Sequence, residues 1–233
     1  MSTDLTGGLE TLSRRLGYEF NDLALLRRAL AHRSWCAEVG GLPSNERLEF
    51  LGDAVLGWVV AEIAYRRHGD LPEGKLTDLR KSVVNASALA EIALSVDIGS
   101  CLLLGKGESA AGGRTKPSIL SDALEAVIGA VYLDGGVIAV ADLIERLFGE
   151  PLKIAASTLD RLDFKTLLQE RTARLFDAAP VYVLTETGPD HAKTFSATVL
   201  VGGRTLGEGS GRSKKVAEQA AAGAAYELLA AEQ

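Results

Sequence analysis

The sequence predicts an all-α domain over residues 1–156 and a small α+β domain, of order α-β-β-β-α, over residues 162–233, with a short linker at 157–161. Three observations predict this division. Apolar residues recur at helical spacing in the first part, between Gly- and Pro-rich breaks. Beyond it the spacing changes to period two. Of the 31 acidic and 25 basic residues, nine of each lie beyond residue 160, so all the excess acid belongs to the first domain.

In the first domain, six segments are expected to be mostly helical: 14–16, 22–34, 47–67, 74–97, 119–133 and 137–148. The Gly-rich segment 105–114 is expected to be a flexible loop. In the second domain, a helix containing Phe164, Leu168 and Leu175 precedes strands at 181–187, 195–201 and 204–209. Gly202-Gly203 is a hairpin signal between the last two strands. An Ala-rich helix over 216–229 closes the domain.

Composition limits the location of the protein. The 47% apolar content suits a packed core, and two cysteines, Cys36 and Cys101, do not make a disulfide framework. The N-terminus resembles no signal peptide, and the apolar stretch 54–61 is far shorter than the roughly 20 residues of a membrane span. We therefore expect a cytoplasmic protein without a membrane partner. The net charge of −6 argues, taken alone, against nucleic acid, so the acidic domain would need cations to meet a polyanion.

The segment Asn45-Glu-Arg-Leu-Glu-Phe-Leu-Gly-Asp53 carries more chemical information than the rest of the chain. Its carboxylates Glu46, Glu49 and Asp53 fall at i, i+3 and i+7. A helix advances about 100° per residue, so all three project from one stripe. A second stripe of the same helix would face a core, and it is formed by Leu48, Leu51, Val55 and Val59.

An arbitrary acidic stripe is more often a solvated helix face than a cation site. Three details favour the cation site here. The stripe has no basic partner at i+4. Gly52 and Gly57 lower helix propensity, which suggests close approach by another segment. A second acidic pair, Asp122 and Glu125, lies in an otherwise apolar helix.

Convergence of the five carboxylates would favour a divalent cation. Like charges about 4 Å apart repel by about 1 kcal/mol even in water, and a cation removes that penalty. An all-oxygen ligand set selects Mg²⁺ or Mn²⁺ over zinc. None of the three histidines follows a Glu by three residues, as a di-iron carboxylate site requires. Without a Ser-His-Asp or Cys-His signature, metal-activated water is the expected nucleophile, and no small-molecule cofactor is expected.

The segment 45–53 resembles the signature of the ribonuclease III family, and Ser118-Ile-Leu-Ser-Asp-Ala-Leu-Glu-Ala126 resembles its second acidic motif. The resemblance covers nearly the whole chain. It implies an all-helical, homodimeric nuclease domain that cuts both strands of double-stranded RNA. The expected products carry 5′-phosphate and 3′-hydroxyl ends with short 3′ overhangs, and the expected role is processing of structured precursor RNAs, ribosomal RNA among them.

The resemblance also implies roles for single residues. The metal ligands would be Glu49, Asp53, Asp122 and Glu125. The catalytic residues would be Asp53, Glu125, Glu46, which lines the same acidic valley, and Glu73, which reaches toward the partner subunit's site. Phe50, by itself an ordinary core aromatic, would be a plug in the dimer interface. His32 and Ser34 match a further family motif and are interpreted as structural polar contacts. Pro117 departs from the family pattern without touching a catalytic position.

The C-terminal domain resembles a double-stranded RNA-binding domain. Ser213 is a plausible N-cap, which places Lys214 and Lys215 in a first helical turn, where the helix dipole disfavours cations and a phosphate would compensate. Such domains span about 16 base pairs and read A-form shape. The residues expected to bind RNA are Thr166, Gln169, Glu170, His191, Lys193, Ser213, Lys214 and Lys215.

We therefore expect a Mg²⁺-dependent endoribonuclease specific for double-stranded RNA, with Mn²⁺ able to substitute. One rival is a non-cleaving RNA-binding scaffold with a degenerate nuclease domain. The presence of all five acidic residues counts against it. A second rival, a metal-dependent hydrolase of small molecules, would not need the C-terminal domain.

Overall fold

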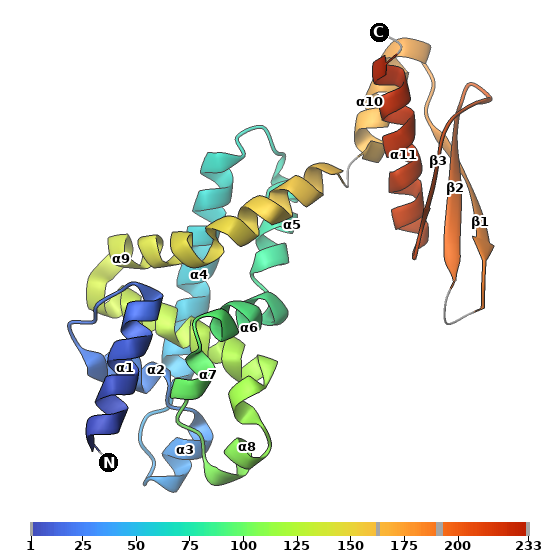
Figure 1. Cartoon of the computed structure of the whole chain (residues 1–233). Helices are drawn as coiled ribbons and strands as arrows, with labels where there is room; N and C mark the ends of the chain where they lie inside the picture. The colour runs from blue at the N-terminus through green and yellow to red at the C-terminus, as the bar shows by residue number, and fades with distance from the viewer. Residues whose placement is uncertain (1, 162–163, 190–192, 232–233) are drawn as a thin grey trace. The chain divides into compact units, whose positions relative to one another are not determined.

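The computed structural model describes residues 2–161, 164–189 and 193–231 and divides into two compact units, Met1–Ala155 and Ala156–Gln233. The described part of the first unit is built from helices, and the second carries a three-stranded sheet with helices (Figure 1). The predicted fold class, all-α followed by α-β-β-β-α, is therefore confirmed.

The first nine helices and one 3-10 helix, η1, follow in chain order. They are α1 (Ser2–Leu16), α2 (Leu23–Ala29), α3 (Arg33–Glu38), α4 (Glu46–Arg67), α5 (Glu73–Val83), α6 (Ala86–Ser95), α7 (Ile98–Cys101), α8 (Lys106–Ala110), η1 (Gly113–Thr115) and α9 (Pro117–Arg161). The second unit contains α10 (Phe164–Phe176), β1 (Val181–Thr187), β2 (Thr194–Val201), β3 (Arg204–Gly211) and α11 (Lys214–Ala231).

Two segments that the sequence predicts as single helices are each divided in two. The segment 22–34 forms α2 and α3, because Ala31 leaves the helix to make a parallel bridge with Leu103. The segment 74–97 forms α5 and α6, because the Asn85 side chain accepts a hydrogen bond from the Ala88 N–H and starts a new helix. Capping by Asn supplies a helix start that apolar spacing does not reveal.

The expected loop at 105–114 also differs from the prediction, since it contains α8 and the beginning of η1. In the other direction, the two segments predicted at 119–133 and 137–148 belong to one helical run, α9. Gly136 kinks that run with a φ of 74°, a conformation that glycine adopts without steric cost. The run continues to Arg161, so residues 157–161, predicted as a linker, are helical.

By length and composition alone, one helix of the described chain could cross a membrane, over Pro117–Ser157. Its apolar character has another explanation in the fold. Residues 119–131 are buried except for Asp122 and Glu125, so the first half of α9 is a core helix of the N-terminal unit. The kink at Gly136 also interrupts the run.

The core of the N-terminal unit is formed by fully buried side chains from helices far apart in the chain. They include Leu12, Leu16, Leu26, Leu30, Leu56, Leu79, Ile98, Leu120, Leu124, Ile128 and Phe148. The expected core stripe of α4 is confirmed at Leu48, Val55 and Val59, whereas Leu51 is half-buried. This packing leaves the opposite stripe of α4 to the carboxylates.

In the C-terminal unit the strands form an antiparallel sheet of order β1-β2-β3. Val181 pairs with Leu200, and Phe195 pairs with Gly211. The predicted hairpin is present at Gly202 and Gly203, which both have positive φ, as a two-residue turn of this kind requires. Helices α10 and α11 cover one face of the sheet (Figure 1), and Leu168 and Leu229 join its buried residues in one core.

Close packing between β3 and α11 depends on small residues. A Cβ added at Gly209 would collide with the backbone of Ala220 and Ala221 on α11. Ala217, Ala221 and Ala225 are fully buried on that side of the helix. The helix can therefore lie directly on the strand. This packing fixes the position of the N-terminal turn of α11 relative to the sheet.

Candidate metal centre and nucleic-acid interface

Helices α4 and α9 cross in direct backbone contact. A Cβ at Gly52 of α4 would collide with the backbone oxygen of Glu125, and a Cβ at Gly129 of α9 would collide with the backbone oxygen of Leu48. The close approach expected at Gly52 is therefore confirmed. The same expectation is wrong for Gly57, because its Cβ would meet nothing within 4 Å. The crossing places the acidic stripe of α4 beside the acidic pair of α9.

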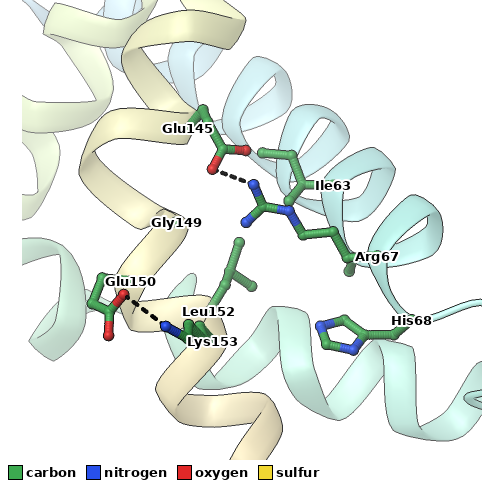
Figure 2. A pocket seen from close by; sticks show the side chains of 9 residues that line it. Ile63, Arg67, His68, Glu145, Gly149, Glu150, Leu152 and Lys153 are labelled. Carbon is green, nitrogen blue, oxygen red and sulfur yellow. Dashed lines mark hydrogen bonds and ion pairs between the residues drawn. The ribbon is translucent and has the colours of Figure 1, made fainter.

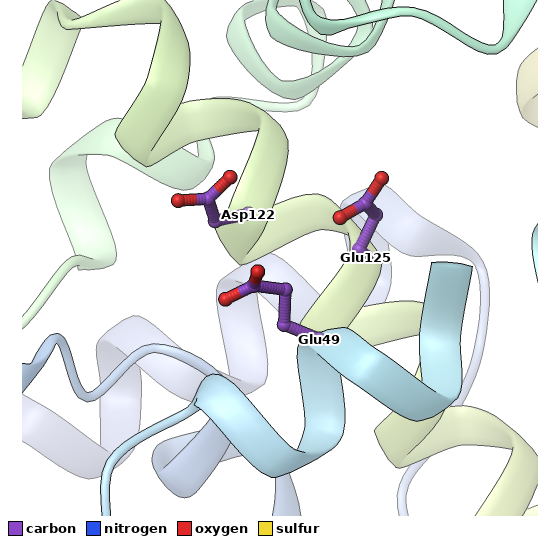
Figure 3. Close-up of side chains that lie close together, drawn as sticks. All are labelled: Glu49, Asp122 and Glu125. Atoms are coloured by element: carbon purple, nitrogen blue, oxygen red, sulfur yellow. The ribbon is translucent and has the colours of Figure 1, made fainter. Parts of the chain in front are cut away.

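Three carboxylates from the two helices converge at this crossing. Glu49 of α4 and Asp122 and Glu125 of α9 each offer one oxygen, and these oxygens lie within 4.8 Å of one another (Figure 3). All three side chains are half-buried. Among the described residues, this group contains three of the four ligands expected from the sequence.

The fourth expected ligand, Asp53, is exposed one turn farther along α4 and is not in the group of three. Its charge nevertheless acts on Glu125 more strongly than that of any other carboxylate. Glu46 lies exposed at the start of α4, where it accepts a hydrogen bond of 2.6 Å from Ser44. Glu73 is exposed in the first turn of α5 and accepts a hydrogen bond from Thr77, 3.0 Å away.

Burial and mutual repulsion change the protonation of the converging carboxylates. Burial, together with the charges of Asp53, Asp122 and Glu49, raises the pKa of Glu125 from 4.5 to about 7. Burial also raises the pKa of Glu49, assisted by the charges of Asp122 and Glu46 and opposed by Arg33. These groups are forced together at an electrostatic cost, and a bound cation would offset it.

A polar network supports the segment that leads into α9. His32 Nδ1 lies 2.8 Å from Ser34 Oγ, and Ser34 Oγ accepts a hydrogen bond of 2.9 Å from the Gly105 N–H. Glu38 accepts another from the Lys106 N–H at 2.8 Å. The interpretation of His32 and Ser34 as structural contacts agrees with this geometry, and burial lowers the pKa of His32. The contribution of Glu38 was not apparent from the sequence, because it depends on two segments about 70 residues apart.

A separate hollow of about 500 Å³ lies between the end of α4 and the second half of α9 (Figure 2). Its charged side chains form ion pairs, Arg67 with Glu145 and Lys153 with Glu150. None of the three converging carboxylates lines it.

The described residues that are expected to bind RNA lie on α10, directly before β2 and at the start of α11. Thr166, Gln169 and Glu170 are exposed at i, i+3 and i+4 on α10 and therefore share one face. Lys193, before β2, lies 3.2 Å from Glu186. His191 lies outside the described residues.

The N-terminus of α11 has the geometry expected from the sequence. Ser213 Oγ accepts a hydrogen bond of 3.3 Å from the Val216 N–H, so this residue caps the helix. Lys214 and Lys215 follow as the first helical residues, and both are exposed. Two cations and the free N–H groups of a helix terminus thus face solvent together, which is a favourable arrangement for a phosphate.

A buried contact that sequence reasoning missed connects the starts of α10 and α11. The Gln219 side-chain oxygen accepts a hydrogen bond of 3.2 Å from the Lys165 N–H, and Lys165 Nζ lies 2.7 Å from Glu218. The same ammonium lies 4.5 Å from the centre of the Tyr182 ring. These contacts fix the start of α10 relative to the start of α11. The spacing of residues within either helix does not predict them.

Comparisons with known proteins agree with both parts of this description. Residues 22–152 match the family model described as ribonuclease-III-like, and residues 164–229 match the double-stranded RNA binding motif. The chain is 57% identical over 221 residues to Ribonuclease 3 of Streptomyces coelicolor, covering 94% of this chain and 79% of that protein. It is also 57% identical to Ribonuclease 3 of Thermobifida fusca, covering 89% and 86%.

A solved structure provides a comparison for the helical unit. The nuclease domain of ribonuclease III from Campylobacter jejuni aligns with a TM-score of 0.58 at 44% identity, covering 61% of this chain and 96% of that chain. That structure is described as showing flexibility in a region involved in dimer formation. With its acidic helix crossing, its C-terminal RNA-binding motif and relatives of this similarity, the chain belongs to the ribonuclease III family and is an endoribonuclease that acts on double-stranded RNA.

Proposed function

We propose that the enzyme requires Mg²⁺ and cuts both strands of the duplex, leaving 5′-phosphate and 3′-hydroxyl ends with short 3′ overhangs. The observation that carries this proposal is the convergence of Glu49, Asp122 and Glu125 at the crossing of α4 and α9. The donors are all carboxylate oxygens, which suit Mg²⁺ and also Mn²⁺. Asp53, one turn away on α4, completes the proposed ligand set.

The raised pKa of Glu125, about 7, supports a cation at this position, because burial and the neighbouring anions disfavour the charged form until a positive charge is present. A bound Mg²⁺ would supply an activated water and stabilise the departing oxygen. The protein supplies the rigid crossing that positions the carboxylates. Glu46 lines the entrance to the cluster, and Glu73 acts toward the partner subunit's site in this proposal.

The C-terminal unit binds the duplex by shape. The exposed face formed by Thr166, Gln169 and Glu170 meets 2′-hydroxyls of a minor groove, and Lys214 and Lys215 bind backbone phosphates. Lys193 and His191 belong to the loop that we assign to a second minor groove. The exposure of the α10 face and the capped N-terminus of α11 support these assignments.

We propose that the enzyme works as a homodimer, because two cuts across a duplex require two sites and a two-fold axis supplies them. An exposed aromatic row on α4 supports this. Phe50, Trp58 and Tyr65 lie on α4 at i, i+8 and i+15 and are 81%, 47% and 72% exposed, so three aromatic side chains of one helix are available to a partner. Trp58 and Tyr65 extend the interface beyond the single residue expected from the sequence.

Replacing Phe50 with Ala tests the dimer. If the ring is buried against a second copy, its loss should weaken association by about 3–5 kcal/mol. Analytical ultracentrifugation over a dilution series should then show monomer at concentrations at which the wild type is dimeric. An unchanged dimer would remove Phe50 from the interface. Val39→Ala provides a control, because Val39 is also exposed, at 44%, but lies outside the aromatic row.

A digest of a perfect RNA duplex, with and without Mg²⁺ and with both ends mapped, tests the proposed reaction. Cleavage of both strands only in Mg²⁺, with staggered 5′-phosphate products, is expected. Binding without cleavage would favour the non-cleaving scaffold. The RNAs processed in the cell are expected to be structured precursors, including ribosomal ones. We propose a cytoplasmic location, which the free thiols of Cys36 and Cys101 support.

A further inference from the structure

A second hollow, of about 330 Å³, opens at the carboxylate cluster formed by Glu49, Asp122 and Glu125, and it is lined by side chains of both charges. Glu46, Glu49 and Asp122 line it, and so do two cations, Arg33 and Lys116. The cations come from different elements, since Arg33 begins α3 and Lys116 directly precedes α9. Their presence in a wall dominated by carboxylates needs an explanation that the metal cluster alone does not provide.

Each cation is held loosely by a carboxylate of the same hollow. Arg33 lies 4.0 Å from Glu46, and Lys116 Nζ lies 3.4 Å from Glu108. Their side chains remain 75% and 53% exposed. The Arg33–Glu46 pair is exposed on both sides, and in the second pair Lys116 is exposed although Glu108 is only 24% exposed. Ion pairs with an exposed cation contribute little to folding, so either cation can turn toward a different anion at little cost.

The RNA strand brings such an anion to this place. A phosphate that reacts at the carboxylate cluster is flanked by other phosphates of the same strand, and Glu46 and Glu49 would repel a neighbouring phosphate that enters the hollow. Repulsion between these anions would oppose productive binding unless cations lie between them. Arg33 is suited to this because its planar guanidinium can donate two parallel hydrogen bonds to one phosphate, while Lys116 acts as a point charge.

We propose that Arg33 and Lys116 form a phosphate subsite for the RNA strand, which holds the backbone next to the phosphate that is cut. The inference rests on the proposed function, because it uses the same metal cluster. It assigns the nuclease unit its own contacts to the RNA backbone, separate from those of Lys214 and Lys215. The two residues bind substrate, and neither is a metal ligand.

Cleavage kinetics of the full-length Arg33→Gln and Lys116→Gln variants test the subsite. KM for a duplex RNA should rise about tenfold for each variant, as expected for loss of a hydrogen bond to a charged group, while kcat at saturating RNA changes little. The slope of log KM against log salt should become shallower by about 0.7–0.9 per lost contact. Arg33→Lys and Lys116→Arg should restore most of the salt dependence.

Two matched variants control for general loss of positive charge. Arg66→Gln removes an arginine that is also 75% exposed and also paired with a glutamate. Lys153→Gln removes a lysine that lines the other hollow (Figure 2) and is paired with Glu150. Neither should change KM or the salt slope. Thermal unfolding of all four variants should match the wild type, since every replaced side chain is exposed.

The subsite is refuted if Arg33→Gln and Lys116→Gln leave KM and its salt dependence unchanged, or if the control variants change them equally. A loss confined to kcat would also refute it, because it would place the cations in the chemistry. These outcomes differ from failure of the proposed function, in which the wild type itself would not cleave a duplex in Mg²⁺. Binding measured in a Glu125→Gln background should show the same salt-slope change without turnover.

Discussion

The N-terminal and C-terminal units both bring a helix into backbone contact at glycine, but with opposite electrostatic results. At Gly52 the crossing of α4 and α9 buries Glu125 beside other carboxylates, and burial together with their charges raises its pKa to about 7. At Gly209 the packing of α11 on β3 leaves Lys214 and Lys215 exposed at a helix N-terminus. A cation-binding site requires carboxylates that the fold holds close together despite their repulsion. A phosphate-binding site requires cations that are exposed to solvent.

Replacing Glu125 with Gln should have the largest effect of the changes considered, and it should act on the carboxylate site of the N-terminal unit alone. The change preserves shape and removes one anionic ligand, so we expect kcat to fall by at least about 10²–10³ while duplex binding is kept. Single-turnover cleavage and a filter-binding assay measure the two properties. Asp53→Asn should behave alike, and Glu150→Gln, an exposed carboxylate paired with Lys153, should be neutral. Near wild-type turnover in saturating Mg²⁺ would contradict the assignment of Glu125.

The two glycine contacts can be broken separately. Gly52→Ala and Gly209→Ala should each destabilise their own unit by about 1–3 kcal/mol, because the added methyl meets backbone atoms. We expect Gly52→Ala to impair cleavage more than binding and Gly209→Ala to do the reverse, as measured by thermal unfolding and the same two assays. Gly107→Ala serves as a control, since its Cβ would meet nothing within 4 Å. Equal losses of both activities in both variants would show that the units are not independent.

Replacing Lys214 and Lys215 together with Ala should weaken binding to duplexes of any sequence. The slope of log K against log salt should become shallower by about one unit per lost contact, because each lysine releases counterions from the RNA. Cleavage should recover partly at saturating RNA, since the carboxylates of the nuclease unit are unchanged. An unchanged salt slope would contradict the phosphate contacts, and complete loss of cleavage at saturating RNA would place the lysines in the chemistry.

The smallest expected effect is a pH dependence of the metal-free enzyme. The folded pKa of Glu125, about 7, exceeds its ordinary value of 4.5, so the folded state binds more protons between these values and stability falls as pH rises through them. Allowing for partial exposure, the loss is about 1 kcal/mol, or about 2–4 °C in unfolding temperature. Calorimetry between about pH 5 and pH 8 measures it. Glu125→Gln should flatten the profile, and Mg²⁺ should stabilise more strongly as pH rises. A profile unaffected by the substitution would contradict the raised pKa of Glu125.

Much of the fold and of the site could be predicted because the signals are local. The change from helical spacing to period two divides the chain, and the carboxylates at i, i+3 and i+7 identify the acidic face of α4. Ser213 before two lysines identifies the capped start of α11. Each prediction depends on residues within a few turns of one another, and over that distance backbone geometry is fixed by residue type.

The features that depend on contacts between distant segments were decided by the tertiary structure alone. Gly52 and Gly57 look alike in the sequence, but only Gly52 meets another helix, and that contact places Glu49 with Asp122 and Glu125. The division of residues 22–34 into two helices likewise depends on pairing between Ala31 and Leu103. By itself the sequence determined which side chains share a face of an element. Which faces meet, and hence which charges are forced together, was decided by packing across the fold, because close approach is a property of two surfaces and is encoded in neither one alone.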